Sequence, residues 1–163
     1  IKEKGIEKPN EIFNYVRMRL VNSISGEGQK DGMDGILICY DKKNLRLECA
    51  SANNSPVLVR HGEAQELEKD RMPVGKGERE QEFKLHTMTI EAGDSLYLYT
   101  DGYADQFGGP KGKKFKYKQL NQLLLEGNTK TMQEQSLILK EKLEEWKGGL
   151  EQVDDICVIG IRI

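Results

Sequence analysis

The sequence has little excess charge and no long apolar run, and both absences narrow the possible functions. Its 163 residues include 25 Lys and Arg against 27 Asp and Glu, a net charge of −2. Because nucleic-acid-binding domains usually carry a basic excess, this balance gives no reason to expect such a partner. No segment is apolar for long enough to span a bilayer, and none has the layout of a secretory signal. We therefore expect a cytoplasmic segment without direct membrane contact.

Cysteine is also scarce. The chain has only Cys39, Cys49 and Cys157, which are widely separated and form no Cys-x-x-Cys pair. Each lies in an apolar stretch of sequence, so the simplest interpretation is three core thiols in a reducing compartment.

Motifs for covalent catalysis and nucleotide binding are missing as well. There is no Gly-x-Ser-x-Gly and no Cys/His pairing. The glycine-rich residues 108–114 lack Walker spacing and predict a flap-like loop instead. The basic cluster at 111–118 is interpreted as a solvated loop and helix start rather than an anion-binding patch. His61 is expected in a turn beside Gly62, and His86 on the exposed polar face of a strand, so neither is assigned a chemical role.

The apolar periodicity predicts an α+β chain. Apolar residues recur at helical spacing after Pro9, and two more helices are predicted at 117–127 and 131–149. Apolar or alternating runs predict strands and turns within 35–41, 45–52, 56–67, 82–102 and 154–163. This order favours an antiparallel sheet covered by helices.

One face of the last predicted helix is largely apolar. We interpret it as core packing rather than a cofactor site; its residues are Met132, Ser136, Leu139, Leu143 and Trp146. No internal repeat or low-complexity stretch interrupts the chain, and its length suits one domain.

Acidic residues stand at the ends of two apolar runs. The run before Thr100 ends in Asp101-Gly102, and the final run begins with Asp154-Asp155. If these strands are antiparallel neighbours, three carboxylates converge at one sheet edge and repel unless a cation lies between them. Such oxygen ligands suit Mg²⁺ or Mn²⁺, and Gly102 permits a close approach. The alternative is an ordinary turn and a strand-flanking acidic pair.

The order of several short motifs adds a resemblance. LYLYTDGYAD, followed by a helical region and VDDICVIGIRI, resembles the end of the PPM-type (PP2C) protein serine/threonine phosphatases, in particular their bacterial SpoIIE/RsbU-like branch. CASANNSPVLVR, MPVG and EAGDSLYLYTDG follow the same order upstream, although Asn53–Pro56 departs from the family's Gly-His-Asn-Pro-Pro. The resemblance covers nearly the whole chain. It implies a PP2C-like α+β fold of antiparallel sheet layers and helices.

The resemblance also implies roles for the acidic residues. The family's Thr-Asp-Gly strand end supplies a metal-binding aspartate, and an acidic residue before the final strand supplies another. Asp101 and Asp154 match these positions, Asp155 matches the neighbouring one, and Gly102 shapes the turn. The implied cofactor is a pair of Mn²⁺ or Mg²⁺ ions. They activate a water that hydrolyses a phosphoserine or phosphothreonine on a regulatory protein, so no catalytic side chain is needed.

Part of the family pattern is missing from this sequence. Family members carry an earlier Asp before an Asp-Gly-His-Gly-like motif that opens a long helix, and neither is found here. Asp31-Gly32 follows a predicted helix, so it is not taken as the missing ligand. We expect residues 1–163 to be the C-terminal portion of a single PP2C-like domain that is incomplete at its N-terminus. The bridging aspartate would then lie upstream of Ile1, which leaves the activity of this chain alone open.

The resemblance further implies partners. It implies a phosphorylated protein substrate of the anti-sigma-factor antagonist type and an N-terminal sensor domain in the parent protein. Open sheet edges in a truncated domain would favour self-association, so a homodimer is considered. Gln106 and Phe107 are predicted to touch a partner. The alternative function is a PP2C-like interaction or regulatory module that does no chemistry.

Overall fold

The computed structural model describes residues 5–24, 32–78 and 81–163. The chain divides into two compact units, the first formed by residues up to Ser55 with Glu68–Glu91 and the second by Pro56–Leu67 with Ala92–Ile163. Each unit combines helix with antiparallel sheet, which confirms the predicted α+β class. Asp31 lies outside the described residues. No helix in the described parts of the chain has the length and apolarity to cross a membrane.

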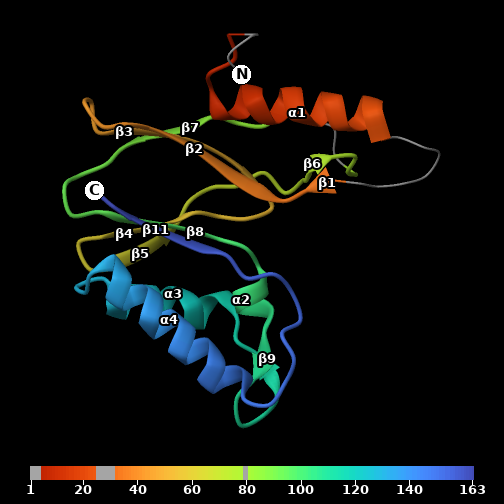
Figure 1. Cartoon of the computed structure of the whole chain (residues 1–163). Coiled ribbons are helices and arrows are strands. Elements are labelled where there is room, and N and C mark those ends of the chain that lie inside the picture. The colour runs from red at the N-terminus through yellow and green to blue at the C-terminus, as the bar shows by residue number, and fades with distance from the viewer. Residues whose placement is uncertain (1–4, 25–31, 79–80) are drawn as a thin grey trace. The chain divides into compact units, whose positions relative to one another are not determined.

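The first unit is one helix against a three-stranded antiparallel sheet (Figure 1). The sheet order is β2-β3-β7, and a two-residue pair, β1 and β6, lies beside it in the same unit. The elements are α1 (Pro9–Ile24), β1 (Gly32–Met33), β2 (Gly35–Asp41), β3 (Arg46–Ala52), β6 (Val74–Gly75) and β7 (His86–Thr89). The predicted apolar face of α1 packs inward, because Phe13 is buried and Val16 and Leu20 contact the same core.

The second unit is a four-stranded antiparallel sheet in the order β11-β8-β4-β5, with α3 and α4 on one side of it (Figure 1). Its main elements are β4 (Val57–Arg60), β5 (Glu63–Glu66), β8 (Ser95–Tyr99), α3 (Tyr117–Gly127), α4 (Met132–Lys147) and β11 (Val158–Arg162). Three short elements follow β8, namely α2 (Gly102–Asp105), β9 (Phe107–Gly108) and β10 (Lys113–Lys114). The core comprises Val57, Val59, Tyr97, Tyr99, Tyr103, Phe115, Leu120 and Leu124.

A partly buried ion pair joins the end of β4 to the residue that precedes β8. The Asp94 carboxylate is buried, and the Arg60 guanidinium donates to its two oxygens at 3.0 Å from Nε and 2.5 Å from a terminal nitrogen. This two-point contact ties Arg60 to the chain at the entry to β8, since a fork of two donors fixes direction as well as distance.

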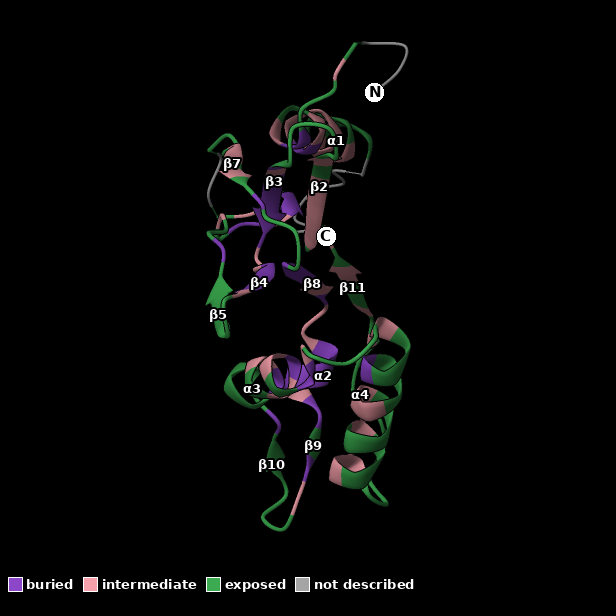
Figure 2. Cartoon of the chain, turned by 90° about the vertical axis from the view of Figure 1, so that its left-hand side faces the viewer, coloured by how far each residue is buried: buried purple, intermediate pink, exposed green. Residues whose placement is uncertain are grey.

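Burial is uneven across the second unit (Figure 2). Buried residues gather in β4, β8 and α2, whereas β5 and much of α4 are exposed. The strand that follows the acidic pair, β11, is a largely exposed strand with one paired neighbour among the described strands.

Two predictions about single residues need correction. Only Cys49 is a buried thiol; Cys39 and Cys157 are exposed, because Cys39 lies on the outer strand β2 and Cys157 precedes the edge strand β11. His86 is half-buried rather than exposed, with Nδ1 3.6 Å from a Glu68 carboxylate oxygen. His61 and Gly62 do form the predicted turn, with φ of 50° and 78°.

Candidate metal centre

The candidate centre lies where β8 ends beside the beginning of β11. The two strands pair antiparallel from Ser95 opposite Arg162 to Tyr99 opposite Val158. The condition set for a shared acidic edge, that these strands are antiparallel neighbours, is therefore met. The residues just beyond the ladder, Thr100-Asp101-Gly102 on one side and Asp154 to Cys157 on the other, consequently face the same edge of the sheet.

Thr100 extends the contact between the strand ends past the ladder. Its backbone N–H donates to the Cys157 carbonyl at 3.1 Å. Its hydroxyl donates to the Asp155 carbonyl at 2.9 Å and accepts from the Cys157 N–H at 3.0 Å. These three bonds fix the main chain of the acidic pair next to the end of β8.

Gly102 is required by a close main-chain approach. A Cβ at this position would lie 2.5 Å from the Asp155 carbonyl oxygen and 3.0 Å from its carbon. Such distances are well inside van der Waals contact, so any side chain would push the two strand ends apart. The close approach that the structure shows at Gly102 is that of the Asp155 backbone, not that of a bound ion.

Asp101 connects β8 to the four-residue helix α2. It occupies the N-cap position, and its carbonyl accepts from the Asp105 N–H at 2.9 Å. Its carboxylate makes no capping hydrogen bond and is half-exposed. The Asp101 side chain therefore does not cap the helix.

Asp154 and Asp155 are both exposed and lie between α4 and β11. Asp154 Oδ1 accepts from the Asp155 N–H at 2.7 Å, and the Asp154 carbonyl accepts from the Gln152 side-chain amide at 2.7 Å. The structure thus brings Gly102 and the main chain of Asp155 into contact. Within the residues that it describes, no group of three or more His, Cys, Asp or Glu side chains gathers closely enough to hold a metal.

Comparison with known families decides the relationship. The family model for Stage II sporulation protein E (SpoIIE) matches residues 4–163. The chain belongs to the SpoIIE family. A search of curated protein sequences gave no match.

Solved structures share this fold. The SiaA PP2C domain of Pseudomonas aeruginosa superposes with a TM-score of 0.90 at 26% identity, over 100% of this chain and 64% of that one. The Mn-presoaked phosphatase domain of the cell fate determinant SpoIIE from Bacillus subtilis gives 0.65 at 17% identity, over 99% and 68%. RsbX in complex with magnesium gives 0.61 at 20% identity, over 92% and 61%. This chain therefore spans about two thirds of each relative, which makes it a partial PP2C domain.

The donor set of this SpoIIE-family chain fits part of a Mg²⁺ or Mn²⁺ site. It offers carboxylate oxygens at two adjoining strand ends, at half-exposed and exposed positions, with a glycine where the backbones meet. Mg²⁺ is commonly held by one or two carboxylates, with waters completing its coordination. The residues present therefore suit such an ion without forming a complete cage.

The loop after α2 corrects the prediction of a contact residue. Gln106 has an exposed fraction of 0%, so it cannot touch a partner, whereas Phe107 is 41% exposed. Within the basic cluster, Lys113 and Lys114 are exposed, and they form the short strand β10 rather than a loop. Sequence reasoning missed the buried role of Gln106, for which the local sequence offers no signal, because the partners of its side chain lie far along the chain.

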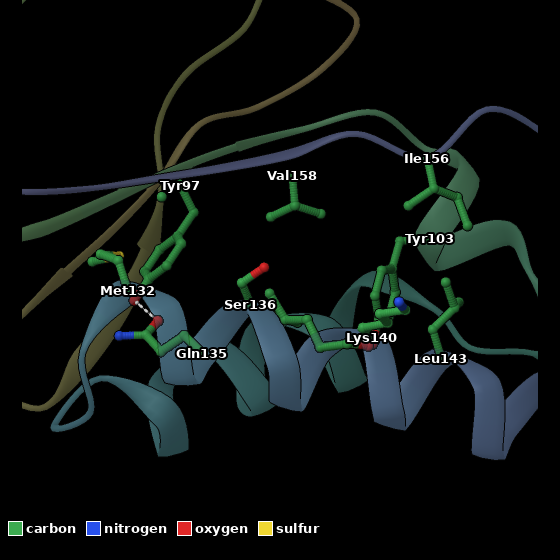
Figure 3. Close-up of a pocket in the computed structure, with 11 residues that line it drawn as sticks. Tyr97, Tyr103, Met132, Gln135, Ser136, Lys140, Leu143, Ile156 and Val158 are labelled. Atoms are coloured by element: carbon green, nitrogen blue, oxygen red, sulfur yellow. Dashed lines mark hydrogen bonds between the residues drawn. The ribbon is translucent and has the colours of Figure 1, made fainter.

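A cavity of about 290 Å³ separates α4 from β8 and β11 in the SpoIIE-family chain (Figure 3). The α4 face predicted to be core lines it in part, and those side chains are only partly buried or exposed. On the wall of this cavity the Tyr97 hydroxyl donates to Gln135 Oε1 at 2.7 Å. Burial raises the pKa of Tyr103 far above its usual value, so this phenol stays protonated and donates to the Leu139 carbonyl.

Proposed function

We propose that this chain is part of a metal-dependent protein serine/threonine phosphatase domain. One observation carries the proposal. In a chain of the SpoIIE family, the antiparallel pairing of β8 with β11 holds Thr100-Asp101-Gly102 against the main chain of the Asp154-Asp155 pair. The proposed reaction is hydrolysis of a phosphoserine or phosphothreonine on a regulatory protein.

The proposed cofactor is Mn²⁺ or Mg²⁺ in a two-metal site. Asp101 and Asp154 would hold a cation, while Gly102 and Asp155 set the separation of the strand ends. Two relatives support this choice, since the SpoIIE domain structure was presoaked with Mn and RsbX is in complex with magnesium. The remaining ligands would come from residues upstream of this chain.

When bound, such ions supply a water of lowered pKa and positive charge that offsets charge developing on the phosphoryl oxygens. The contribution of this chain is position. Thr100 holds the Asp155 main chain, and the short helix α2 fixes Asp101 at the end of a buried strand. Because Asp154 and Asp155 are exposed, a phosphorylated protein can reach this edge of the sheet.

We further propose the partners that the family resemblance implies. The substrate would be a phosphorylated protein of the anti-sigma-factor antagonist type, and a sensor domain would precede the phosphatase domain in the parent protein. Self-association into a homodimer is a further proposal, favoured by the exposed edge strand β11.

The test is Mn²⁺-dependent release of phosphate from a phosphoserine peptide. It compares this chain with an extended protein that continues upstream of Ile1 to the length of the SiaA domain. We expect activity in the extended protein alone, because the site is then complete. Activity of this chain alone would mean that the ligands are misassigned.

A non-catalytic interaction module is the second candidate. It is favoured by the absence of a three-ligand cluster among the residues that the structure describes. This candidate would be supported over the phosphatase if neither protein released phosphate in the same assay, with or without Mn²⁺. Circular dichroism would have to show that both proteins are folded.

A further inference from the structure

Gln106 is a fully buried polar residue directly after α2, five positions beyond Asp101. A buried side-chain amide is tolerated only where its donors and acceptor find partners, because leaving them unsatisfied is unfavourable. The partners of Gln106 therefore reveal what this residue holds in place.

The side chain of Gln106 bonds to the segment that leads to the acidic pair. We call residues 148–157 the connecting segment; it runs past β9 and α2 before it enters β11 (Figure 1). Gln106 Nε2 donates to the Glu151 carbonyl at 2.9 Å and to its own neighbour's carbonyl, that of Phe107, at 3.0 Å. Its Oε1 accepts from the Val153 N–H at 3.4 Å. The donor and the acceptor of the Gln106 side-chain amide thus both bond to the main chain just before Asp154.

The main chain of Gln106 is itself fixed from two other elements. Its carbonyl accepts from the Phe115 N–H at 2.9 Å and from the Trp146 indole N–H at 3.1 Å. The Trp146 carbonyl in turn accepts from the Gly109 N–H at 2.7 Å. Phe115, just after β10, and Trp146, in the last turn of α4, therefore fix the main chain of Gln106. The side chain that bonds to the connecting segment thus extends from a fixed position.

The connecting segment has little apolar packing before Asp154. It contains no helix or strand, and Leu150 and Val153 are 50% and 53% exposed. Ile156 is its partly buried apolar residue that packs against the core, and it lies after the acidic pair. Hydrogen bonds from the Gln106 amide near the middle of the segment and from Thr100 near its end are fixed contacts on either side of Asp154. On the side that precedes Asp154, hydrogen bonds rather than apolar burial consequently position the main chain.

We propose that Gln106 is a positioning residue for the metal centre. It does not touch the ion or the substrate; it sets the position of Asp154 relative to Asp101 by fixing the main chain at Glu151 and Val153. The inference rests on the proposed function for its catalytic consequence, and on the described hydrogen bonds for its structural part.

The structural part is tested by amide hydrogen exchange in this chain. Gln106→Met keeps the side-chain length and removes its strong hydrogen bonds. The matched control is Gln135→Met, which makes the same change at a residue 4% exposed whose amide bonds to Tyr97 and Lys130 instead. After correction for global stability, we expect exchange at Val153–Asp155 to rise about tenfold in Gln106→Met alone. Equal exchange in both variants would overturn the inference.

The catalytic part is tested by the Mn²⁺ dependence of the extended protein. We expect Gln106→Met to raise the half-saturating Mn²⁺ concentration about tenfold while kcat at saturating Mn²⁺ stays within about threefold of wild type, since a displaced ligand weakens metal binding first. Gln135→Met should change neither. An unchanged half-saturating concentration would refute the positioning role.

The two readouts fail separately. If the wild-type extended protein shows no Mn²⁺-dependent activity, the proposed function is wrong, and amide exchange still decides whether Gln106 holds the connecting segment. If Gln106→Met does not fold, Trp146→Phe replaces it, because that change removes one donor to the Gln106 carbonyl and leaves the amide. It should shift exchange at Val153–Asp155 in the same direction by a smaller factor, and no shift would overturn the inference.

Discussion

The two strand ends that meet at the candidate centre differ in how they are held in place. After β8 the chain enters α2, where Gly102, Tyr103 and Ala104 are all buried. Before β11 the connecting segment is exposed through Asp155. One half of the centre is therefore part of a packed core, and the other half is exposed up to Asp155 and bonds to that core through Gln106 and Thr100.

The difference follows from the side chains on each side. The Tyr103 ring meets Phe115 edge to face at 5.2 Å between centroids, and Phe115 meets Trp146 in the same manner. Such aromatic contacts add to the burial of large apolar area. Glu151, Gln152 and the acidic pair offer no comparable apolar surface. Of the two proposed ligands, Asp101 therefore lies at the fixed position and Asp154 at the adjustable one.

The largest effect is expected from Asp101→Asn in the extended protein. Removing the carboxylate charge from the fixed position should lower kcat/KM by at least about a hundredfold, a loss typical of deleting one electrostatic contact at a reacting centre. Saturating Mn²⁺ should not restore it. The control is Asp105→Asn, which changes an α2 carboxylate paired with Lys114. Near wild-type turnover of Asp101→Asn would remove Asp101 from the centre.

Gly102→Ala should force apart the two strand ends, the one after β8 and the one before β11. The new Cβ would meet the Asp155 carbonyl oxygen at 2.5 Å, and the main chain must shift to relieve the overlap. We expect a loss of about 1–3 kcal/mol in the free energy of unfolding, measured by denaturant titration. Gly149→Ala is the control, because nothing lies within 4 Å of its added Cβ. Equal stability of the two variants would show that the strand ends adapt freely.

Thr100→Val isolates the hydrogen bonds between the halves. Valine keeps the shape and β-branching but removes the hydroxyl that bonds to the Asp155 carbonyl and the Cys157 N–H. The expected loss is about 1–2 kcal/mol in the free energy of unfolding. Thr87→Val, at an exposed position in β7, controls for the change of residue type. A smaller loss than in this control would mean that solvent replaces both bonds.

The sequence predicted the two strands better than it predicted the centre. The apolar run 95–99 and the final apolar run have the length and composition of strands, so β8 and β11 could be expected, whereas their pairing was only a condition. The helix α2 could not, because four residues starting with glycine have no readable period. Nor could the burial of Gln106, since a polar residue is buried only when distant main-chain groups come to it. The adjustable half of the centre depends on such distant contacts.

The smallest expected effect comes from the far end of α4 and separates two explanations of the connecting segment. Thr131 and Glu134 form a capping box there, and hydrogen bonds from the Thr131 backbone and hydroxyl lower the pKa of Glu134 from its ordinary 4.5. A pKa that is lower in the folded state stabilises the protein at pH values above the pKa of the same group in the unfolded state. That stabilisation is lost as the pH falls through the pKa of the folded state. Glu134→Gln should therefore lower Tm slightly at pH 7, with a smaller difference near pH 3.

The same variant shows what holds Asp154. If α4 as a whole positions the connecting segment, loosening its N-terminal cap will raise amide exchange at Val153–Asp155. If the Gln106 amide does so, exchange there will be unchanged while exchange in the first turn of α4 rises. We expect the second result, because the bonds from Gln106 reach the connecting segment directly and Trp146 lies in the last turn of α4, far from the cap.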